Sequence, residues 1–209
     1  MKLAIIKYNA GNIQSVLNAL ERLGVNAEVT DNAEKIRSAD KVIFPGVGEA
    51  SSAMRSLKEN DLDKIIKELK QPVLGICVGM QLLCEHSEEN DTECLGIVPV
   101  KVKRFPTSPL YPVGGREGQG GRLKVPQVGW NTIFHLQSPL FKNIPDKSYI
   151  YNVHSYYAED SQYTIAKCEY GLEYAAAIKK DNFYGVQFHT EKSAEIGDKI
   201  IKNFLELVQ

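Results

Sequence analysis

The chain has 209 residues, of which 43% are apolar and 24% are charged, and its formal net charge at neutral pH is −1. This composition predicts a single globular domain over residues 1–209 and argues against a disordered chain. Because the charges nearly balance, the sequence gives no reason to expect nucleic acid or an anionic membrane as a partner.

The first 85 residues alternate between short apolar runs and amphipathic stretches, as expected for βαβ units. Strands are predicted at residues 2–8, 26–30, 41–44 and 71–76. A helix is predicted over residues 12–24, with its apolar side chains on one face and Gly24 at its end. Further helical patterns cover residues 50–69 and the residues after Cys77. We therefore expect a mostly parallel, doubly wound sheet.

The second half changes character, because strand-like runs follow one another with few helical interruptions. These runs are residues 95–105, 149–157, 162–170, 174–181 and 182–188. Antiparallel pairing is expected among them. An amphipathic helix is predicted over residues 194–208. The fold class is therefore α/β, a mostly parallel doubly wound sheet with an antiparallel, strand-rich second half and flanking helices.

The stretch YPVGGREGQGGRLKVP, residues 111–126, is rich in glycine and charge and is predicted to be an exposed loop. It resembles a phosphate-binding loop only weakly. No convincing strand leads into it and it lacks the G-K-[ST] ending, so we do not expect a nucleotide site there.

Targeting and cysteine usage point to the cytoplasm. No apolar run is long enough to span a bilayer, and the N-terminal sequence becomes polar too early for a signal peptide. The four cysteines show no C-x-x-C or clustered His/Cys pattern, so no zinc site is predicted. We expect reduced thiols.

The segment LGICVGMQLL, residues 74–83, places Cys77 between Gly75 and Gly79. A buried strand precedes the segment and a helical pattern follows, so G-x-C-x-G falls at a strand–turn–helix corner. This is the pattern of a nucleophile elbow with sulfur in place of the serine hydroxyl. The helix N-terminus would favour the thiolate. The stretch alone fits equally well a buried cysteine in a tight connection.

A cysteine nucleophile needs a base, and a third group usually orients that base. In GVQFHTEKS, Glu191 follows His189 by two residues, so both side chains project to one face of an extended segment. The preceding run YGVQF places His189 at a strand end, where ligands gather in open α/β sheets. The other histidines are weaker candidates, being solvated, without an acidic neighbour or flanked by aromatic residues: His86, His135 and His154.

Attack on a carbonyl creates an oxyanion that needs backbone N–H donors. We expect one donor from Val78, directly after the nucleophile, and a second from Val47 in the segment PGVGEA, residues 45–50. Gly46 and Gly48 flank Val47 and would let its peptides turn over at little steric cost, which predicts a switchable donor. An ordinary glycine-rich strand–helix turn is the other interpretation.

Together, PGVG, LGICVGMQLL and GVQFHTEKS resemble the class I glutamine amidotransferases. Three further segments resemble more narrowly the glutaminase subunits of imidazole glycerol phosphate synthases: YNAGNIQSV near the start, KVP-VGWN at residues 124–131 and VHSYY at residues 153–157. The similarity runs along the whole chain.

This resemblance implies that Cys77 attacks the side-chain amide of glutamine and releases ammonia, with His189 as acid and base and Glu191 as its orienting group. It implies further that glutamine is held by Gly48, Gln81, Glu89, Ser155 and Tyr156. No metal or organic cofactor is implied.

The resemblance also implies a partner. The chain would form a heterodimer with a (β/α)8-barrel cyclase subunit and pass ammonia to it through a channel. The ammonia would serve imidazole glycerol phosphate formation in histidine biosynthesis.

Several positions depart from the family's pattern. Thr190 stands where proline is usual in H-P-E-K-S, Gln127 where histidine is common, and Lys7 where aspartate is common, while residues 111–121 look inserted. A proline would stiffen the segment between base and orienting group, so we expect Thr190 to loosen it modestly. Since related subunits feed other acceptors, such as surface-sugar precursors, the sequence leaves the acceptor open.

Two other hypotheses use the same fold. A stand-alone cysteine hydrolase would need the elbow but neither KVP-VGWN nor a docking face, and it would work without a barrel partner. A non-catalytic regulatory subunit would have no reason to keep Cys77, His189 and Glu191 together, so the sequence argues against it.

Overall fold

The computed structural model describes residues 1–9, 12–107 and 123–208. The glycine-rich residues 111–121, predicted to be an exposed loop, lie outside this part of the chain. Within the described ranges, no helix is both long and apolar enough to cross a membrane.

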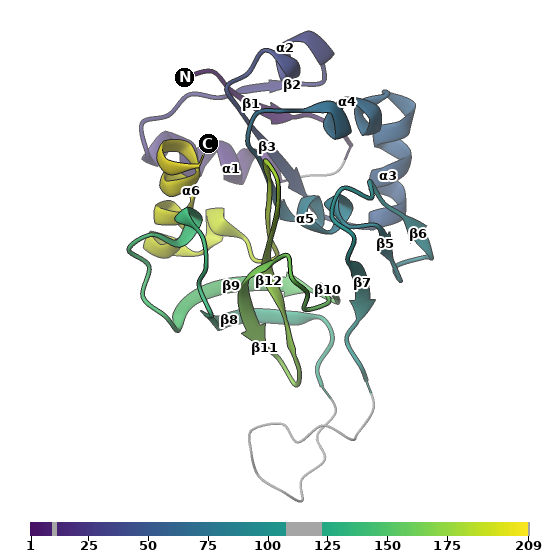
Figure 1. The fold of residues 1–209 in the computed structure, drawn as a ribbon, viewed down its shortest axis with the longest axis vertical. Coiled ribbons are helices and arrows are strands. Elements are labelled where there is room, and N and C mark those ends of the chain that lie inside the picture. Colours follow the sequence, from purple (N-terminus) through teal and green to yellow (C-terminus); the bar gives the residue numbers. More distant parts are fainter. Residues whose placement is uncertain (10–11, 108–122, 209) are drawn as a thin grey trace, which may run out of the picture.

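A parallel layer forms the upper part of the molecule in Figure 1. Its strands run in the order β2-β1-β3-β4-β13, and each neighbouring pair is parallel. The bounds are β1 Leu3–Ile6, β2 Glu28–Thr30, β3 Lys41–Gly46, β4 Val73–Cys77 and β13 Phe183–Val186. All but β2 are buried along their whole length, which explains their continuous apolar runs. The predicted doubly wound parallel sheet is confirmed.

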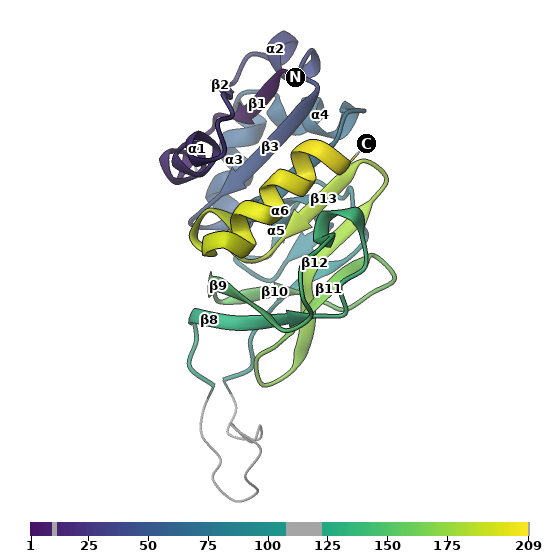
Figure 2. The same cartoon turned by 90° about the vertical axis from the view of Figure 1, so that its left-hand side faces the viewer.

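Helices cover both faces of this layer. Figures 1 and 2 show α1 (Ile13–Arg22) and α6 (Ala194–Leu207) on one face, with α3, α4 and α5 on the other. The remaining bounds are α2 Ala33–Arg37, α3 Ala50–Glu59, α4 Leu62–Glu68 and α5 Val78–Leu83. The helical pattern predicted over residues 50–69 is two helices, because Asp61 adopts a left-handed conformation, with φ 53°, between them.

The second half continues the same sheet as a largely antiparallel layer. From β13 the order runs β12-β10-β7-β5-β6, while β11 pairs with β12 and β8, and β8 pairs with β9. The bounds are β5 His86–Ser87, β6 Thr92–Glu93, β7 Lys101–Arg104, β8 Gln127–Phe134, β9 Ser148–His154, β10 Tyr156–Ala158, β11 Thr164–Glu169 and β12 Glu173–Lys180. Two short 3-10 helices, η1 (Pro139–Phe141) and η2 (Thr190–Lys192), connect parts of this half.

The antiparallel pairing expected among the predicted runs is right for the pairs that they form with one another, which are β7–β10, β10–β12, β11–β12 and β12–β13. Parallel pairing occurs where this half meets strands outside those runs. β13 pairs antiparallel with β12 but parallel with β4, and β5 pairs parallel with β7. A strand inside a sheet has two neighbours, and its own apolar pattern identifies neither of them. β13 thereby joins the two layers.

The sheet order places the candidate site. β2 and β3 lie on opposite sides of β1. The order in which successive strands are added to the sheet therefore reverses at β1. In open α/β sheets, ligands bind outside the carboxyl ends of the strands near such a point. At that end β3 leads into Val47, β4 ends at Cys77, and β13 is followed by His189.

Candidate active site

Cys77 is the last residue of β4 and directly precedes α5, the strand–turn–helix arrangement predicted for it. Its backbone has φ 55° and ψ −113°, an uncommon conformation for a residue that carries a side chain. Such a backbone costs about 1–3 kcal/mol and persists only where the surrounding structure enforces it. Strain at a strand–helix corner is the geometry of a nucleophile elbow.

Close packing of α5 on the sheet enforces this turn. At Gly79 a Cβ atom would lie 1.9 Å from the carbonyl oxygen of Phe44 in β3, so glycine alone fits. Gly75 faces the same helix, since a Cβ there would lie 2.9 Å from the backbone of Gly79. The glycines on either side of Cys77 therefore let the backbones of strand and helix touch.

Gly46 has a different role from the one predicted for it. It ends β3, pairs with Cys77, and a Cβ on it would lie 2.5 Å from the backbone nitrogen of Gly79. Gly46 is thus a packing position under the elbow. Gly48 alone has the freedom expected of a hinge, with φ +92° and open space where a Cβ would stand.

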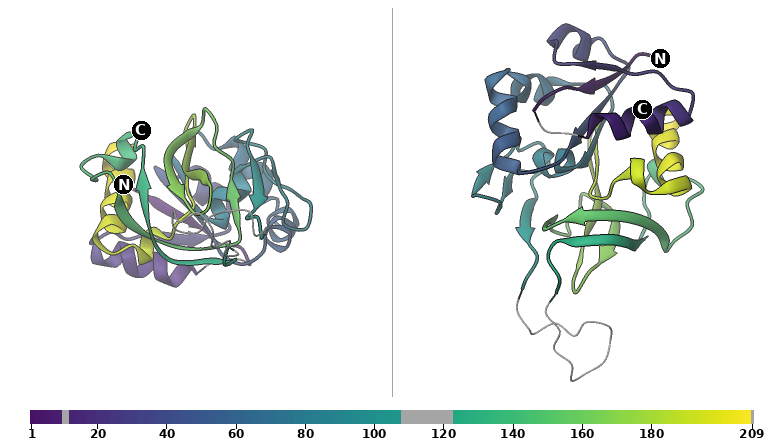
Figure 3. Two further views of the ribbon diagram at one scale, coloured as in Figure 1. Left: turned by 90° about the horizontal axis from the view of Figure 1, so that it is seen from below. Right: turned by 180° about the vertical axis from the view of Figure 1, so that it is seen from behind.

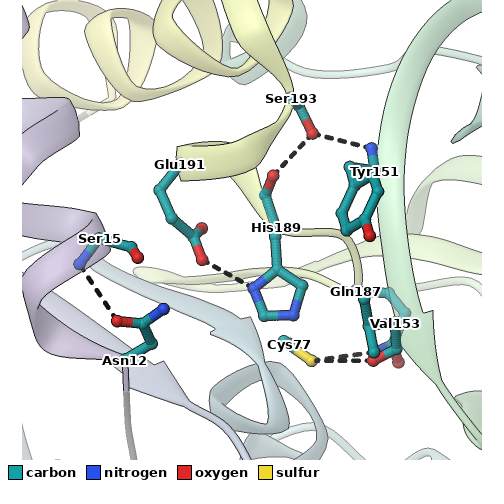
Figure 4. A network of polar contacts seen from close by, with 9 residues as sticks. All are labelled: Asn12, Ser15, Cys77, Tyr151, Val153, Gln187, His189, Glu191 and Ser193. Carbon is teal, nitrogen blue, oxygen red and sulfur yellow. Dashed lines mark hydrogen bonds and ion pairs between the residues drawn. The ribbon is translucent and has the colours of Figure 1, made fainter. Parts of the chain in front are cut away.

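His189 is held through its backbone and through its ring. Its N–H donates to the carbonyl of Tyr151 (2.9 Å), and its carbonyl accepts from the hydroxyl of Ser193 (2.6 Å). The ring Nδ1 lies 2.7 Å from Oε1 of Glu191. Since an ionised carboxylate only accepts, Nδ1 carries the proton and donates it to this bond. Figure 4 shows the ring between Glu191 and Cys77.

The charges around His189 favour its protonated form. Burial lowers the pKa of His189, but hydrogen bonding and charge interactions with Cys77 and Glu191 outweigh burial and raise that pKa above its ordinary value. A His189 that holds its proton is suited to act as a general acid beside Cys77. Oε2 of Glu191 is buried without a hydrogen-bond partner in the described ranges, which leaves the carboxylate directed at His189 through Oε1.

A cavity of about 350 Å³ opens beside Cys77. Its walls contain all but one of the residues predicted for the site: Val47, Gly48, Cys77, Val78, Gln81, Glu89, Ser155, Tyr156 and His189. Glu191 is the exception, because it lies behind the ring of His189. The structure therefore brings together residues that the chain separates by more than half its length, while their individual roles stay predictions.

Two of the predicted glutamine-binding residues are already hydrogen-bonded to the fold. Nε2 of Gln81 donates to the carbonyl of Tyr156 (3.0 Å) and to Oε1 of Gln187 (2.9 Å). Oε2 of Glu89 accepts the N–H of Ala50 (2.7 Å), the first residue of α3, and burial raises the pKa of Glu89. Both side chains are thus fixed before a ligand arrives.

The other histidines have different surroundings. His154 lines the cavity but is buried, its Nδ1 lies 2.7 Å from the carbonyl of Tyr156, and burial lowers its pKa to about 4, so it is neutral. His86 pairs with Asp91 (2.8 Å) in the β5–β6 region, and the backbone N–H of His135 donates to Asp146. Neither of these two lines the cavity.

The departures from the family's pattern have visible consequences at two positions. Thr190 is completely buried, and its hydroxyl has no hydrogen-bond partner in the described part of the chain. Oε1 of Gln127 accepts from the hydroxyl of Tyr174 (3.0 Å), which packs edge-on against Phe105. Lys7 is exposed, and nothing in the structure explains the residue at that position.

Two residues beside Cys77 were not found from the sequence. Gln187 is completely buried, with Nε2 3.9 Å from Sγ of Cys77. The hydroxyl of Tyr8 donates to the carbonyl of Pro45 (2.8 Å), and burial together with nearby Cys77 raises its pKa. Tertiary packing alone brings them here, since Tyr8 follows β1 and Gln187 follows β13.

The cysteines are all free thiols, and Cys77 is the one at the cavity wall. Burial raises the pKa of the other three thiols, Cys84, Cys94 and Cys168. Within residues 1–9, 12–107 and 123–208, no group of three or more His, Cys, Asp or Glu side chains is arranged to hold a metal ion.

Comparisons with known proteins agree with this geometry. The family described as glutamine amidotransferase class-I matches residues 4–208. The imidazole glycerol phosphate synthase subunit HisH of Bacteroides fragilis (strain YCH46) is 55% identical, over 99% of this chain and 100% of its own length. HisH of Shewanella sediminis is 47% identical, over 97% of this chain and 89% of its own length.

Solved structures share the fold at lower identity. A glutamine amidotransferase superposes with a TM-score of 0.71 at 15% identity, covering 100% of this chain and 99% of its own. PurLQS from Thermotoga maritima gives a TM-score of 0.68 at 17% identity, with 100% and 99% covered. The family match and the close relatives together show that the chain belongs to the class I glutamine amidotransferases and, among them, to the imidazole glycerol phosphate synthase subunits HisH.

Proposed function

We propose that residues 1–209 act as one amidotransferase domain, which hydrolyses glutamine and supplies ammonia to a cyclase partner in an imidazole glycerol phosphate synthase. One observation carries the chemistry: a strained Cys77 elbow and a His189–Glu191 pair (2.7 Å) meet at one cavity. The names of the close relatives support the pathway, since each is called a subunit of that synthase.

The first half of the reaction uses Cys77 and His189. The thiolate attacks the amide carbon of glutamine, a C–S bond forms and the carbonyl oxygen becomes an oxyanion. As the oxyanion collapses, the C–N bond breaks and the imidazolium of His189 gives its proton to the leaving nitrogen. Ammonia departs and a thioester remains on Cys77.

The second half returns the enzyme to its starting state. Neutral His189 takes a proton from water, the hydroxide attacks the thioester, and the C–S bond breaks to release glutamate and the thiolate. Glu191 holds the Nδ1–H of His189 through both halves, so that Nε2 always faces the reacting atoms. The pair ends as imidazolium and thiolate, ready for another glutamine.

The oxyanion and the substrate need further groups. We assign the oxyanion to the backbone N–H groups of Val47 and Val78, two residues that line the cavity with Cys77. We propose that glutamine itself is bound by five further cavity-lining residues, which the family resemblance implies for this role: Gly48, Gln81, Glu89, Ser155 and Tyr156. Among these, Glu89 offers a carboxylate for the α-ammonium group of glutamine.

The proposed docking face for a (β/α)8-barrel cyclase is formed by β8 and β9, which run side by side in Figure 3 (right). Val128 pairs with Val153, and Trp130 pairs with Tyr151, so their side chains share one face of this hairpin. Large apolar side chains are exposed on that face: Val128, Trp130, Tyr149 and Val153. Exposure of this kind marks an interaction surface, and Val153 also lines the cavity from which ammonia must leave.

The test is the variant Cys77→Ser in complex with the barrel partner. Glutamine-dependent synthesis should fall to background, while synthesis with added ammonium salt should match the wild type, because the thiolate only makes ammonia. Loss of both activities would give Cys77 a structural role and refute the assignment. Glutamine hydrolysis at full rate without a partner would instead favour a stand-alone hydrolase, and a different ammonia acceptor would favour a related amidotransferase pair.

A further inference from the structure

Gln187 lies at the centre of a buried chain of amide contacts that ends at the nucleophile. It stands directly after β13 and has no exposed surface. Its Oε1 lies 2.9 Å from Nε2 of Gln81, and its Nε2 lies 3.9 Å from Sγ of Cys77. The side chain therefore connects a cavity-wall glutamine with the reacting sulfur.

The orientation of both amides follows from one carbonyl. The carbonyl of Tyr156 can only accept, so the atom of Gln81 that lies 3.0 Å from it is the nitrogen. The second N–H of that nitrogen faces Gln187, where it needs an acceptor, so Gln187 presents its oxygen to Gln81. The remaining end of Gln187, an NH₂ group, must then face Cys77.

The chain is anchored at both ends. The carbonyl of Tyr156 also accepts from Nδ1 of His154 (2.7 Å), and the backbone N–H of Gln187 donates to Ala176 in β12 (2.8 Å). Because Gln187 is fully buried, water cannot readily replace its N–H groups. Its amide is thus held toward the sulfur by the fold.

Two uncharged groups compete for the protonation state of Cys77. The carbonyl of Val153, 3.9 Å from Sγ, can accept a hydrogen bond from the thiol only. The N–H of Gln187 donates to sulfur and is best matched by the thiolate, because a charged acceptor strengthens the bond. The two contacts therefore pull in opposite directions.

We propose that Gln187 is a positioning residue that donates to the Cys77 thiolate and ties it to Gln81, so that nucleophile and substrate-binding amide keep a fixed relation. This rests on the proposed glutaminase function and deepens it. Gln187 does not titrate, so its support for the thiolate persists when His189 changes protonation during the reaction.

The ionisable groups that face Cys77 come from several elements. They are His189 with Glu191 behind it, Tyr8 at the end of β1, and the cavity-lining Glu89, His154 and Lys192. Gln187→Met leaves all of these groups in place and adds no charge. Its effect on the pH dependence of Cys77 reactivity therefore isolates the contribution of the amide.

The experiment measures the rate of alkylation of Cys77 by iodoacetamide against pH, without glutamine. Burial protects the other thiols, raising the pKa of Cys94 to about 12 and that of Cys168 to about 11, and Cys77→Ser corrects for any remaining reaction. For Gln187→Met we expect the profile to move up by about one pH unit, which is about tenfold less thiolate on the rising limb. Gln187→Glu keeps the acceptor for Gln81, removes the amide donor and adds a carboxylate beside the sulfur, so it should move the profile farther than Gln187→Met does.

Gln127→Met is the matched control, since Gln127 is also a buried glutamine, but its side chain accepts from Tyr174 and is not among those that line the cavity. It should leave the alkylation profile where it is in the wild type. Glutamine turnover of the complex should fall about tenfold in Gln187→Glu, mostly in kcat, because the Gln81 contact survives.

A wild-type profile in both Gln187 variants would overturn the proposal and leave the glutaminase assignment intact. If neither variant folds, the test is an NMR pH titration of wild-type protein whose own glutamine side chains carry ¹⁵N, without added substrate. A side-chain amide signal should then shift with the same midpoint as Cys77 alkylation and lose that shift in Cys77→Ser. Absence of such a signal would equally overturn it.

Discussion

The two loops that follow the neighbouring strands β3 and β4 at the cavity wall are held to very different degrees. The Cys77 elbow is fixed on all sides, because α5 lies so close to the sheet that Gly79 cannot carry a Cβ atom. The segment from Val47 to Glu49 is half-buried to exposed, and Gly48 has φ +92° with open space beside it. One loop is therefore rigid through packing, while the other has few neighbours to hold its peptides in one orientation.

This difference suggests a division of labour between the loops. In the proposed mechanism, the elbow holds the nucleophile in place, whereas the orientation of the Val47 peptide determines whether the oxyanion has its second donor. Loss of one oxyanion donor lowers turnover by about 10²–10³-fold. Glu49, the last residue of the open loop, accepts from the side-chain amide of Asn90, and the next residue, Ala50, donates its backbone N–H to Glu89. The open loop is thereby linked to a residue that we assign to glutamine binding.

The largest effect should come from the rigid side of the site. His189→Ala removes the group that moves the proton, so glutamine turnover of the complex should fall by about 10²–10⁴-fold. Glu191→Gln should cost less, because it keeps a hydrogen bond to Nδ1 and loses only charge. Ammonium-dependent synthesis serves as the control in both. A larger loss from Glu191→Gln than from His189→Ala would mean that the roles are wrongly assigned.

The open loop should respond differently to substitution at its two glycines. Gly46→Val should prevent correct folding, because a Cβ at this position would stand 2.5 Å from the backbone of Gly79. Gly48→Val has space but an unfavourable φ, so the chain should fold and bind its partner while activation of glutamine turnover falls by up to about 10²-fold.

Circular dichroism and thermal unfolding, with wild-type protein in parallel, show whether each variant folds. Kinetics of the complex then measure activation in the variants that fold. A folded Gly46→Val variant with normal activation would contradict the packing interpretation. Full activation in Gly48→Val would show that the loop does not need its freedom.

The smallest effect should appear at Thr190, between the two rigid residues His189 and Glu191. Thr190→Pro removes a buried hydroxyl without a hydrogen-bond partner and restricts the unfolded chain. His189 already has the extended backbone that a residue before proline requires, with φ −83° and ψ 101°. We expect stability to rise by about 1–2 kcal/mol, or a few degrees in Tm, with glutamine turnover retained. A lower Tm would show that the threonine backbone N–H or hydroxyl has a partner after all.

The rigid side of the site was also the easier one to predict from sequence. Its signals are local: G-x-C-x-G around Cys77, H-x-E at His189, and the apolar periodicity of α1 and α6. The strands of the first half could be predicted because parallel strands are buried on both faces and carry continuous apolar runs.

The parts that were missed depend on contacts between distant segments. β8 was not predicted as a strand, because its apolar residues Val128 and Trp130 face outward while Gln127 is buried, the reverse of the usual pattern. Gln187 gave no signal, since its partners Gln81 and Cys77 lie more than a hundred residues away. The packing role of Gly46 depends likewise on Gly79 in another element.

We propose that this chain is a latent glutaminase whose open loop supplies its oxyanion donor only when the partner is bound. The direct measurement is steady-state glutamine hydrolysis by the chain alone, by the complex with the barrel subunit, and by the complex with its acceptor ligand bound. We expect slow turnover by the chain alone and a rise of at least about 10²-fold in the liganded complex, mainly in kcat, since the oxyanion donor acts on the transition state. Turnover by the chain alone that equals turnover by the complex would contradict the proposal.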